Sequence, residues 1–273
     1  MDIGLLTVPF ANDPLDTVVT FAAEEGFDAL EVAAGPGCAH FDPAHPEKLA
    51  EAAAEWGLRV SSLAAYVNIT DGDADARQAN QDLLQRLVQV ASRAGTDVVC
   101  TIAGLPPAGV TREQAIREVA APFLADLAAR AAGVGVKLAL ENWYATNLMN
   151  LAQWDLLFEL APAENLGLNF DPSHLVWQDI DHLLAVERYA SRIFHTHAKD
   201  VEIVRHKRAF LGNQSGGWWR YVIPGFGDID WGVYVGRLRA NGYDGVLSIE
   251  HEDNAVGREE GFLQGLHHLE QFC

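Results

Sequence analysis

The chain alternates between short, nearly continuous apolar runs and longer stretches with helical periodicity. Apolar runs without polar alternation are typical of parallel strands whose two faces are both covered. The runs predict strands at 3–8, 28–33, 59–66, 97–104, 136–143, 166–171, 192–200 and 245–252.

Helical patterns fill the segments between these runs. Thr111 and Gln114 stand in capping-box register at the start of one helix, and Pro122 is expected to kink or break it. Asp230 is expected to cap another helix, which ends at Gly242. Together the patterns predict helices near 14–25, 46–56, 73–95, 111–133, 150–160, 179–190, 230–242 and 258–271.

Strands that are each followed by a helix favour a closed (β/α)₈ TIM barrel of the α/β class over an open, doubly wound sheet. The length of 273 residues agrees with this, because such barrels typically take ~250 residues. No linker, low-complexity tract or short repeat interrupts the chain. We therefore expect one barrel domain over residues 1–273.

Composition and charge limit the kinds of binding partner and the cellular compartment that we expect for this protein. The formal net charge of −19 repels phosphate backbones, so a nucleic acid partner is not expected. Three cysteines without a CxxC pair are typical of a reduced, cytoplasmic protein. No apolar stretch approaches the ~20 residues of a membrane span, and no signal peptide is evident, so membrane association is not expected either.

Candidate chemistry stands at the carboxyl ends of four consecutive predicted strands, which end in Glu141, Asp171, His197 and Glu250. In a (β/α)₈ barrel these ends carry the active site. Taken alone, each residue has an ordinary alternative as a cap, a turn residue, a core histidine or a solvated acid. Four such coincidences on adjacent strands are improbable. Three oxygen donors and one imidazole predict a divalent cation such as Mn²⁺, Mg²⁺ or Co²⁺, and they suit structural zinc poorly.

The motifs "FDPSH", "HTHAKD", "PGFGDIDW" and "GYDGVLSIEHED" resemble the xylose isomerase-like TIM-barrel superfamily, also called the sugar phosphate isomerase/epimerase family. The resemblance covers most of the chain and is densest over 137–253. It implies that the four strand-end residues bind one divalent metal ion and that Glu141 and Glu250 also act as the acid/base pair. It further implies that His174 contacts substrate oxygens. Arg205 is the nearest candidate for the family's arginine after the metal-binding histidine, at a longer spacing.

The implied function is a metal-dependent sugar isomerase or epimerase that abstracts a proton next to a carbonyl. Mn²⁺ is the expected ion, with Mg²⁺, Co²⁺ and Zn²⁺ as alternatives. The same residues would serve a dehydratase or eliminase acting on an inosose or a 3-keto sugar. An endonuclease IV-like repair enzyme is disfavoured, because no histidine ends the third or fourth strand and the chain is strongly acidic. A non-catalytic sugar-binding barrel would not need a complete metal and acid/base set.

Other residues are candidates for the walls of the pocket. Glu31, Tyr66, Asn68 and Trp143 follow or end strands, although packing explains each of them equally well. No phosphate cradle is evident, which favours a free sugar, an inositol-like polyol or an oxidised glycoside as the substrate.

The long segment 212–231 contains Trp218 and Trp219, which either stack on a sugar or anchor the segment against the barrel rim or a second subunit. A homodimer or homotetramer is compatible with the second alternative. Lys199 shares the strand face of His197 and is expected to reach the substrate, whereas His195 is expected to face the helix layer.

Overall fold

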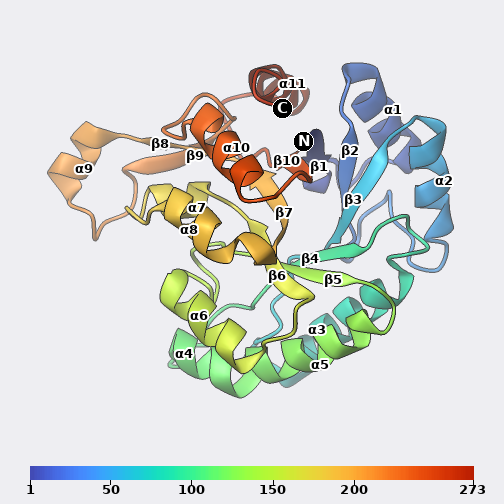
Figure 1. The fold of residues 1–273 in the computed structure, drawn as a ribbon, viewed down its shortest axis with the longest axis horizontal. Coiled ribbons are helices and arrows are strands. Elements are labelled where there is room, and N and C mark those ends of the chain that lie inside the picture. The colour runs from blue at the N-terminus through green and yellow to red at the C-terminus, as the bar shows by residue number, and fades with distance from the viewer.

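The computed structural model describes residues 1–273 as a closed barrel of parallel strands surrounded by helices (Figure 1). Around the barrel the strand order is β1-β10-β7-β6-β5-β4-β3-β2. The predicted TIM-barrel fold is therefore confirmed. The barrel strands are β1 (Asp2–Leu6), β2 (Ala29–Ala33), β3 (Arg59–Ala64), β4 (Val98–Ile102), β5 (Lys137–Glu141), β6 (Leu166–Phe170), β7 (Ile193–Ala198) and β10 (Val246–Ile249).

Most helices lie close to the positions that the apolar periodicity predicts, whereas the short α7 (Ser173–Val176) and α9 (Arg205–Leu211) were not predicted. The other helices are α1 (Leu15–Glu25), α2 (Glu47–Glu55), α3 (Ala74–Val90), α4 (Arg112–Ala115), α5 (Ala121–Ala132), α6 (Leu151–Leu160), α8 (His182–Tyr189), α10 (Trp231–Ala240) and α11 (Arg258–Leu269). None of the helices combines the length and the apolar character that a membrane-spanning helix needs.

The caps and the proline kink follow the sequence. Thr111 and Gln114 form the expected capping box, and the Asp230 carboxylate accepts a hydrogen bond from the backbone of Val233. The helix that contains Pro122 is interrupted by a π turn at Ile116–Ala120, and the proline lies in the first turn of α5. The interruption arises because proline has no N–H to donate to the preceding turn.

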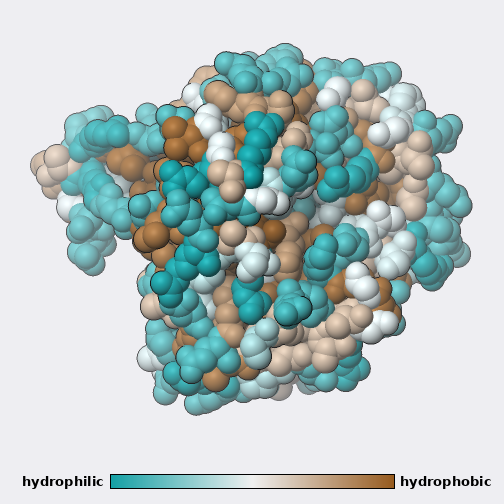
Figure 2. Space-filling model, viewed as in Figure 1, coloured by the Kyte–Doolittle hydropathy of each residue, from teal (hydrophilic) through white to brown (hydrophobic).

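A two-stranded antiparallel sheet was not expected from the sequence. Strands β8 (Asp200–Ile203) and β9 (Trp219–Val222) pair with each other, and α9 connects them at the end of an arm that projects from the barrel (Figure 1). The arm presents a mostly hydrophilic surface (Figure 2). The long segment 212–231 was not expected to contain a strand, although Arg220 separates Trp219 from Tyr221 as a polar residue does between two side chains on one face of a strand.

Gly167 allows β6 to approach the start of β7. A Cβ atom added at this position would overlap the backbone carbonyl oxygen of Arg192 and lie 2.5 Å from the ring of Phe194. Because a backbone atom cannot move aside cheaply, only a residue without a side chain fits here. The glycine thus helps to set the register of the two strands that carry Asp171 and His197.

We predict that Gly167→Ala lowers the free energy of unfolding by ~1–3 kcal/mol or more, because overpacking forces the strands apart. As the matched control, Gly236→Ala in α10 meets no atom within 4 Å. It should raise the free energy of unfolding by up to about 1 kcal/mol, through the better helix propensity of alanine. Urea unfolding followed by circular dichroism measures both. Wild-type stability of Gly167→Ala would contradict the close-approach argument.

Candidate metal and substrate site

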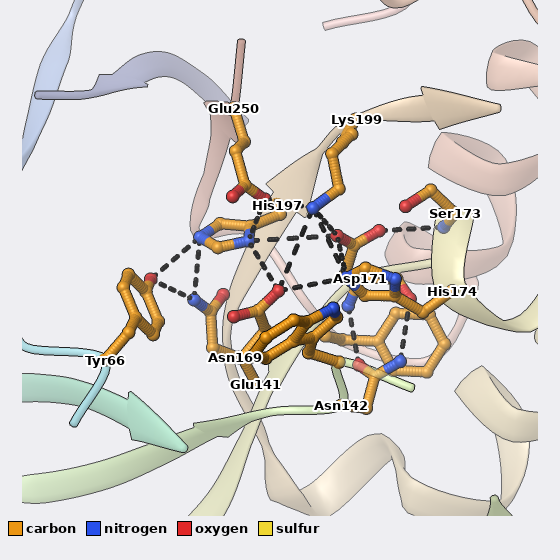
Figure 3. Close-up of polar contacts among 12 residues, drawn as sticks. Tyr66, Glu141, Asn142, Asn169, Asp171, Ser173, His174, His197, Lys199 and Glu250 are labelled. Carbon is orange, nitrogen blue, oxygen red and sulfur yellow. Dashed lines mark hydrogen bonds and ion pairs between the residues drawn. The ribbon is translucent and has the colours of Figure 1, made fainter. Parts of the chain in front are cut away.

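The structure brings the four predicted strand-end residues together. Glu141 ends β5, Asp171 follows β6, His197 lies in β7 and Glu250 follows β10. One donor atom from each of the four side chains lies within 4.8 Å of the others. Asp171 and His197 are fully buried, and the side chains of Glu141 and Glu250 are only 7% and 13% exposed. Figure 3 shows the four side chains converging from the barrel wall.

The donor atoms in this cluster fit a divalent cation. Asp171 Oδ2 and His197 Nδ1 are buried and have no hydrogen-bond partner of good geometry. Such atoms are rare in folded proteins, since an unsatisfied buried polar atom costs about 1–3 kcal/mol. Both atoms face the carboxylates of Glu141 and Glu250. A set of three carboxylates and one imidazole suits Mn²⁺ or a similar ion.

The Asp-Pro-Ser turn after β6 orients Asp171. Its Oδ1 accepts a hydrogen bond from the backbone N–H of Ser173 at 2.8 Å, as in an Asx turn. The Asn142 amide holds the backbone of Asp171 through two hydrogen bonds of 2.8 Å each. One carboxylate oxygen therefore shapes the turn while the other, Oδ2, points into the cluster. Asp171 is therefore both the residue that forms the turn and a candidate metal ligand.

Lys199 lies among the carboxylates. Its ammonium is 2.6 Å from Glu250 Oε2, 3.1 Å from Asp171 Oδ2 and 3.4 Å from Glu252 Oε2. Burial opposes its charge, but the carboxylates of Asp171 and Glu250 outweigh this and raise the pKa of Lys199 well above its usual value. The lysine is therefore a cation that compensates the buried negative charge of the cluster.

His197 lies between two carboxylates. Its Nε2 is 3.2 Å from Glu31 Oε2, and its Nδ1 is 2.9 Å from Glu250 Oε2. Burial disfavours the charged imidazole, but Glu31 and Glu250 raise the pKa of His197 well above its usual value. Burial would also raise the pKa of Glu250, yet Lys199 and His197 hold it well below its usual range. Binding of a cation through Nδ1 must therefore release a proton.

His174, in α7, lies beside the cluster. Its Nε2 is 3.1 Å from Glu141 Oε1 and 3.3 Å from Asp171 Oδ2. Its Nδ1 is 2.5 Å from the hydroxyl of Tyr221, which belongs to β9. The imidazole therefore links the carboxylates to the projecting arm.

An aromatic wall lies next to His174. The ring of Trp219 stacks on Trp177 at 4.4 Å between centroids, and Tyr144 and Tyr221 contact Trp219 at 5.5 and 4.9 Å. Tyr221 also lines a cavity of about 830 Å³. The other residues lining this cavity are Arg220, His251, Glu252, Asp253, Asn254 and Ala255.

The two tryptophans of the arm occupy different environments. Trp218 is 1% exposed and packs between Trp177 and the guanidinium of Arg208, which lies 4.8 Å from its ring. Trp219 is only half-buried, within the aromatic wall. The anchoring alternative thus describes the observed position of Trp218, and Trp219 is the tryptophan beside the site.

Several other predicted site residues lie away from the four-residue cluster. Arg205, in α9, has a side chain that is 76% exposed and pairs with Asp228 at 2.6 Å. Asn68 holds its own loop, where its Oδ1 accepts a hydrogen bond from the backbone N–H of Leu105 at 2.8 Å. Trp143 is half-buried against Tyr144. The structure brings none of the three into hydrogen-bonding contact with the cluster.

The expected orientation of His195 is wrong. His195 lies inside the barrel, where its Nδ1 is 3.0 Å from the side-chain amide of Asn169 and its Nε2 is 3.1 Å from Ser61 Oγ. Residues two apart on a strand point to the same face, so His195 and His197 must share the barrel interior. The same rule would have found Asn169, which the sequence analysis missed two residues before Asp171.

We predict that Lys199→Met, studied in the presence of a chelator, lowers the free energy of unfolding by ~3–5 kcal/mol. Removing one partner of a buried ion pair leaves the other charges uncompensated. Added Mn²⁺ should recover part of the loss. Lys207→Met, which changes an exposed lysine of α9, is the matched control and should unfold like the wild type. Equal stability of the two variants would contradict the charge-compensating role.

The fold and the site define a class of protein, and comparison with known proteins names it. The model of the xylose isomerase-like TIM barrel family matches residues 19–272. The chain belongs to this family.

The relatives include enzymes that act on sugars or polyols and one uncharacterised protein. L-ribulose 3-epimerase of Mesorhizobium japonicum is 28% identical, over 88% of this chain and 76% of that enzyme. Inosose dehydratase of Clostridium perfringens is 32% identical over 47% of this chain and 44% of that enzyme. The uncharacterised protein YfiH of Bacillus subtilis is 27% identical over 99% of both chains.

Solved structures share the fold. An IolI protein, crystallised with a bound zinc atom, superposes with a TM-score of 0.79 at 18% identity and covers 100% of this chain and 99% of its own.

Proposed function

We propose that this protein is a divalent-metal-dependent isomerase or epimerase that moves a proton next to the carbonyl of a free sugar or keto sugar. The observation that carries the proposal is the position of two glutamates on either side of the cluster. In the barrel order, β5 with Glu141 and β10 with Glu250 are separated by β6 and β7, which carry Asp171 and His197. A substrate between the glutamates would expose one face to each carboxylate.

The chain's own residues would divide the work as follows. Glu141, Asp171, His197 and Glu250 would hold one divalent ion, for which Mn²⁺ is our first choice. A bound ion would supply Lewis-acid stabilisation of the negative charge that develops on the substrate oxygens. One glutamate would take the proton next to the carbonyl, and the other would deliver a proton to the opposite face or to the neighbouring carbon. His174 would contact substrate oxygens.

A lyase is the second candidate. It is supported by the 32% identity to inosose dehydratase, which covers about half of each chain. The first step would be the same proton abstraction. One of the two glutamates, in its protonated form, would then donate its proton to a departing β-hydroxyl group, so that water leaves. The product would be an unsaturated ketone, which absorbs in the ultraviolet.

We predict that Glu141→Gln and Glu250→Gln each lower turnover by ~10²–10⁴-fold, the usual contribution of a positioned acid or base. The assay screens ketoses, inososes and 3-keto sugars with Mn²⁺ in D₂O and follows deuterium incorporation by NMR. Removing metal with a chelator should abolish turnover. Glu51→Gln, on the exposed face of α2, is the matched control.

The variants also distinguish the reactions. A one-sided glutamine variant of an epimerase should still exchange the proton next to the carbonyl without inverting the carbon. Near wild-type turnover of both variants on an identified substrate would exclude the glutamate pair. Loss of water from the substrate would establish the lyase instead.

For the aromatic wall we predict that Trp219→Ala raises KM while metal binding stays intact. The change removes the ring that supports Tyr221 but touches none of the four cluster residues. Trp218→Ala should instead lower the free energy of unfolding by ~3–5 kcal/mol, because it leaves a large cavity under the arm. Steady-state kinetics and urea unfolding measure the two effects. An unchanged KM for Trp219→Ala would remove the wall from substrate binding.

A further inference from the structure

The inside of the barrel is polar directly beneath the four-residue cluster. Small (β/α)₈ barrels usually fill this layer with branched apolar side chains. Here Glu31, Asn169 and His195 are all buried there. A buried carboxylate costs several kcal/mol unless partners compensate its charge. Glu31 is 0% exposed, so its contacts must account for its position.

Glu31 is held between a phenol and an imidazole. The hydroxyl of Tyr66 donates to Glu31 Oε1 at 2.5 Å, and His197 Nε2 lies 3.2 Å from Glu31 Oε2. The side-chain amide of Asn169 lies 2.9 Å from the same Nε2 and 3.1 Å from the Tyr66 oxygen. Figure 3 shows Tyr66 and Asn169 on the side of the His197 ring that faces away from Asp171.

The donors and acceptors around Nε2 assign its proton. A neutral imidazole carries one N–H, and the nitrogen without it is the one that binds a metal ion. Ser61 Oγ donates to the carbonyl of Leu30 and so accepts from His195 Nε2, which leaves His195 Nδ1 to accept from the amide nitrogen of Asn169. The amide oxygen of Asn169 then faces His197 Nε2, and Tyr66 gives its single proton to Glu31. Both the Asn169 oxygen and the Glu31 carboxylate can therefore accept an N–H at Nε2, and Glu31 is the charged acceptor. Nδ1, which faces the carboxylates of the cluster, is then the nitrogen left to bind the ion.

We infer that Glu31 is a positioning residue for the metal site: it accepts the Nε2–H of His197 and thereby presents Nδ1 to the ion. This inference rests on the proposed function, since it presumes the proposed metal site. It gives Glu31 a role other than the pocket-lining role considered from the sequence. Partners of this kind typically change metal affinity by ~10–100-fold when they are removed.

The test measures metal affinity directly. Mn²⁺ binding is followed by isothermal titration calorimetry in wild-type protein, Glu31→Gln, Tyr66→Phe and Thr101→Val. Glu31→Gln should weaken binding by ~10–100-fold, because the glutamine side chain is neutral and can donate its amide protons to Nε2. Tyr66→Phe leaves the carboxylate but removes its orienting hydrogen bond, so a smaller loss is expected.

Thr101→Val is the matched structural control. Thr101 is buried in β4 and donates a hydrogen bond to the backbone of Ala65 at 2.8 Å, without touching His197. It should lose stability but keep its Mn²⁺ affinity. If Thr101→Val weakened binding as much as Glu31→Gln, general loosening of the barrel would explain both results, and the inference would be overturned.

A second measurement does not depend on any variant folding. In Zn²⁺-loaded wild-type protein with ¹⁵N-labelled histidine, His197 should show a protonated Nε2 and a metal-bound Nδ1. A protonated Nδ1 would overturn the inference. If the wild type binds Mn²⁺ but Glu31→Gln binds it equally well, the inference fails and the proposed function survives. If the wild type binds none of Mn²⁺, Mg²⁺, Co²⁺ or Zn²⁺, both fail.

Discussion

The burial of several carboxylates at one end of the barrel is the constraint on which the rest of the site depends. Negative charges at this density repel one another and lose their hydration, so the fold must supply cations and donors nearby. Lys199 and His197 provide the positive charge, and His174 contacts two of the carboxylates. These compensating groups come from β7, from the residue directly after it and from the short α7 that follows β6. The charge balance therefore ties together the strands that carry the proposed ligands.

The projecting arm is joined to this charge balance through Asp200, the first residue of β8. Its carboxylate accepts hydrogen bonds from the backbone N–H groups of Val201, Gly225, Gly227 and Ile229 and from the indole of Trp231. This network fixes the chain on both sides of the arm. Asp200 directly follows Lys199, so the residue that anchors the arm is next in sequence to the cation that compensates the cluster. The arm in turn brings Tyr221 to His174, and the wall of the cavity is thereby built onto the charged cluster.

The proposed function covers several related reactions, because inversion, proton transfer to the next carbon and loss of water would all begin with removal of the same proton. What separates them is where the second proton goes and which substrate group stands opposite it. In the proposed function those choices would depend on the walls of the cavity, which combine the ring of Tyr221 with the polar side chains of residues 251–254. Relatives that share this fold include both an epimerase and a dehydratase. Under the proposed function, the residues around the cluster are therefore where the substrate and the outcome would be decided.

The sequence by itself determined the barrel and the convergence of Glu141, Asp171, His197 and Glu250. Both follow from local apolar patterns and from one rule, that the carboxyl ends of parallel strands meet on the same face. Other features depended on contacts between distant parts of the chain. Glu31 meets His197 across 166 positions of sequence, and the pairing of β8 with β9 sets which arm tryptophan is buried. The apolar pattern of the sequence does not reveal such contacts between distant residues. Their burial, charge pairing and hydrogen bonding are established only when the barrel closes.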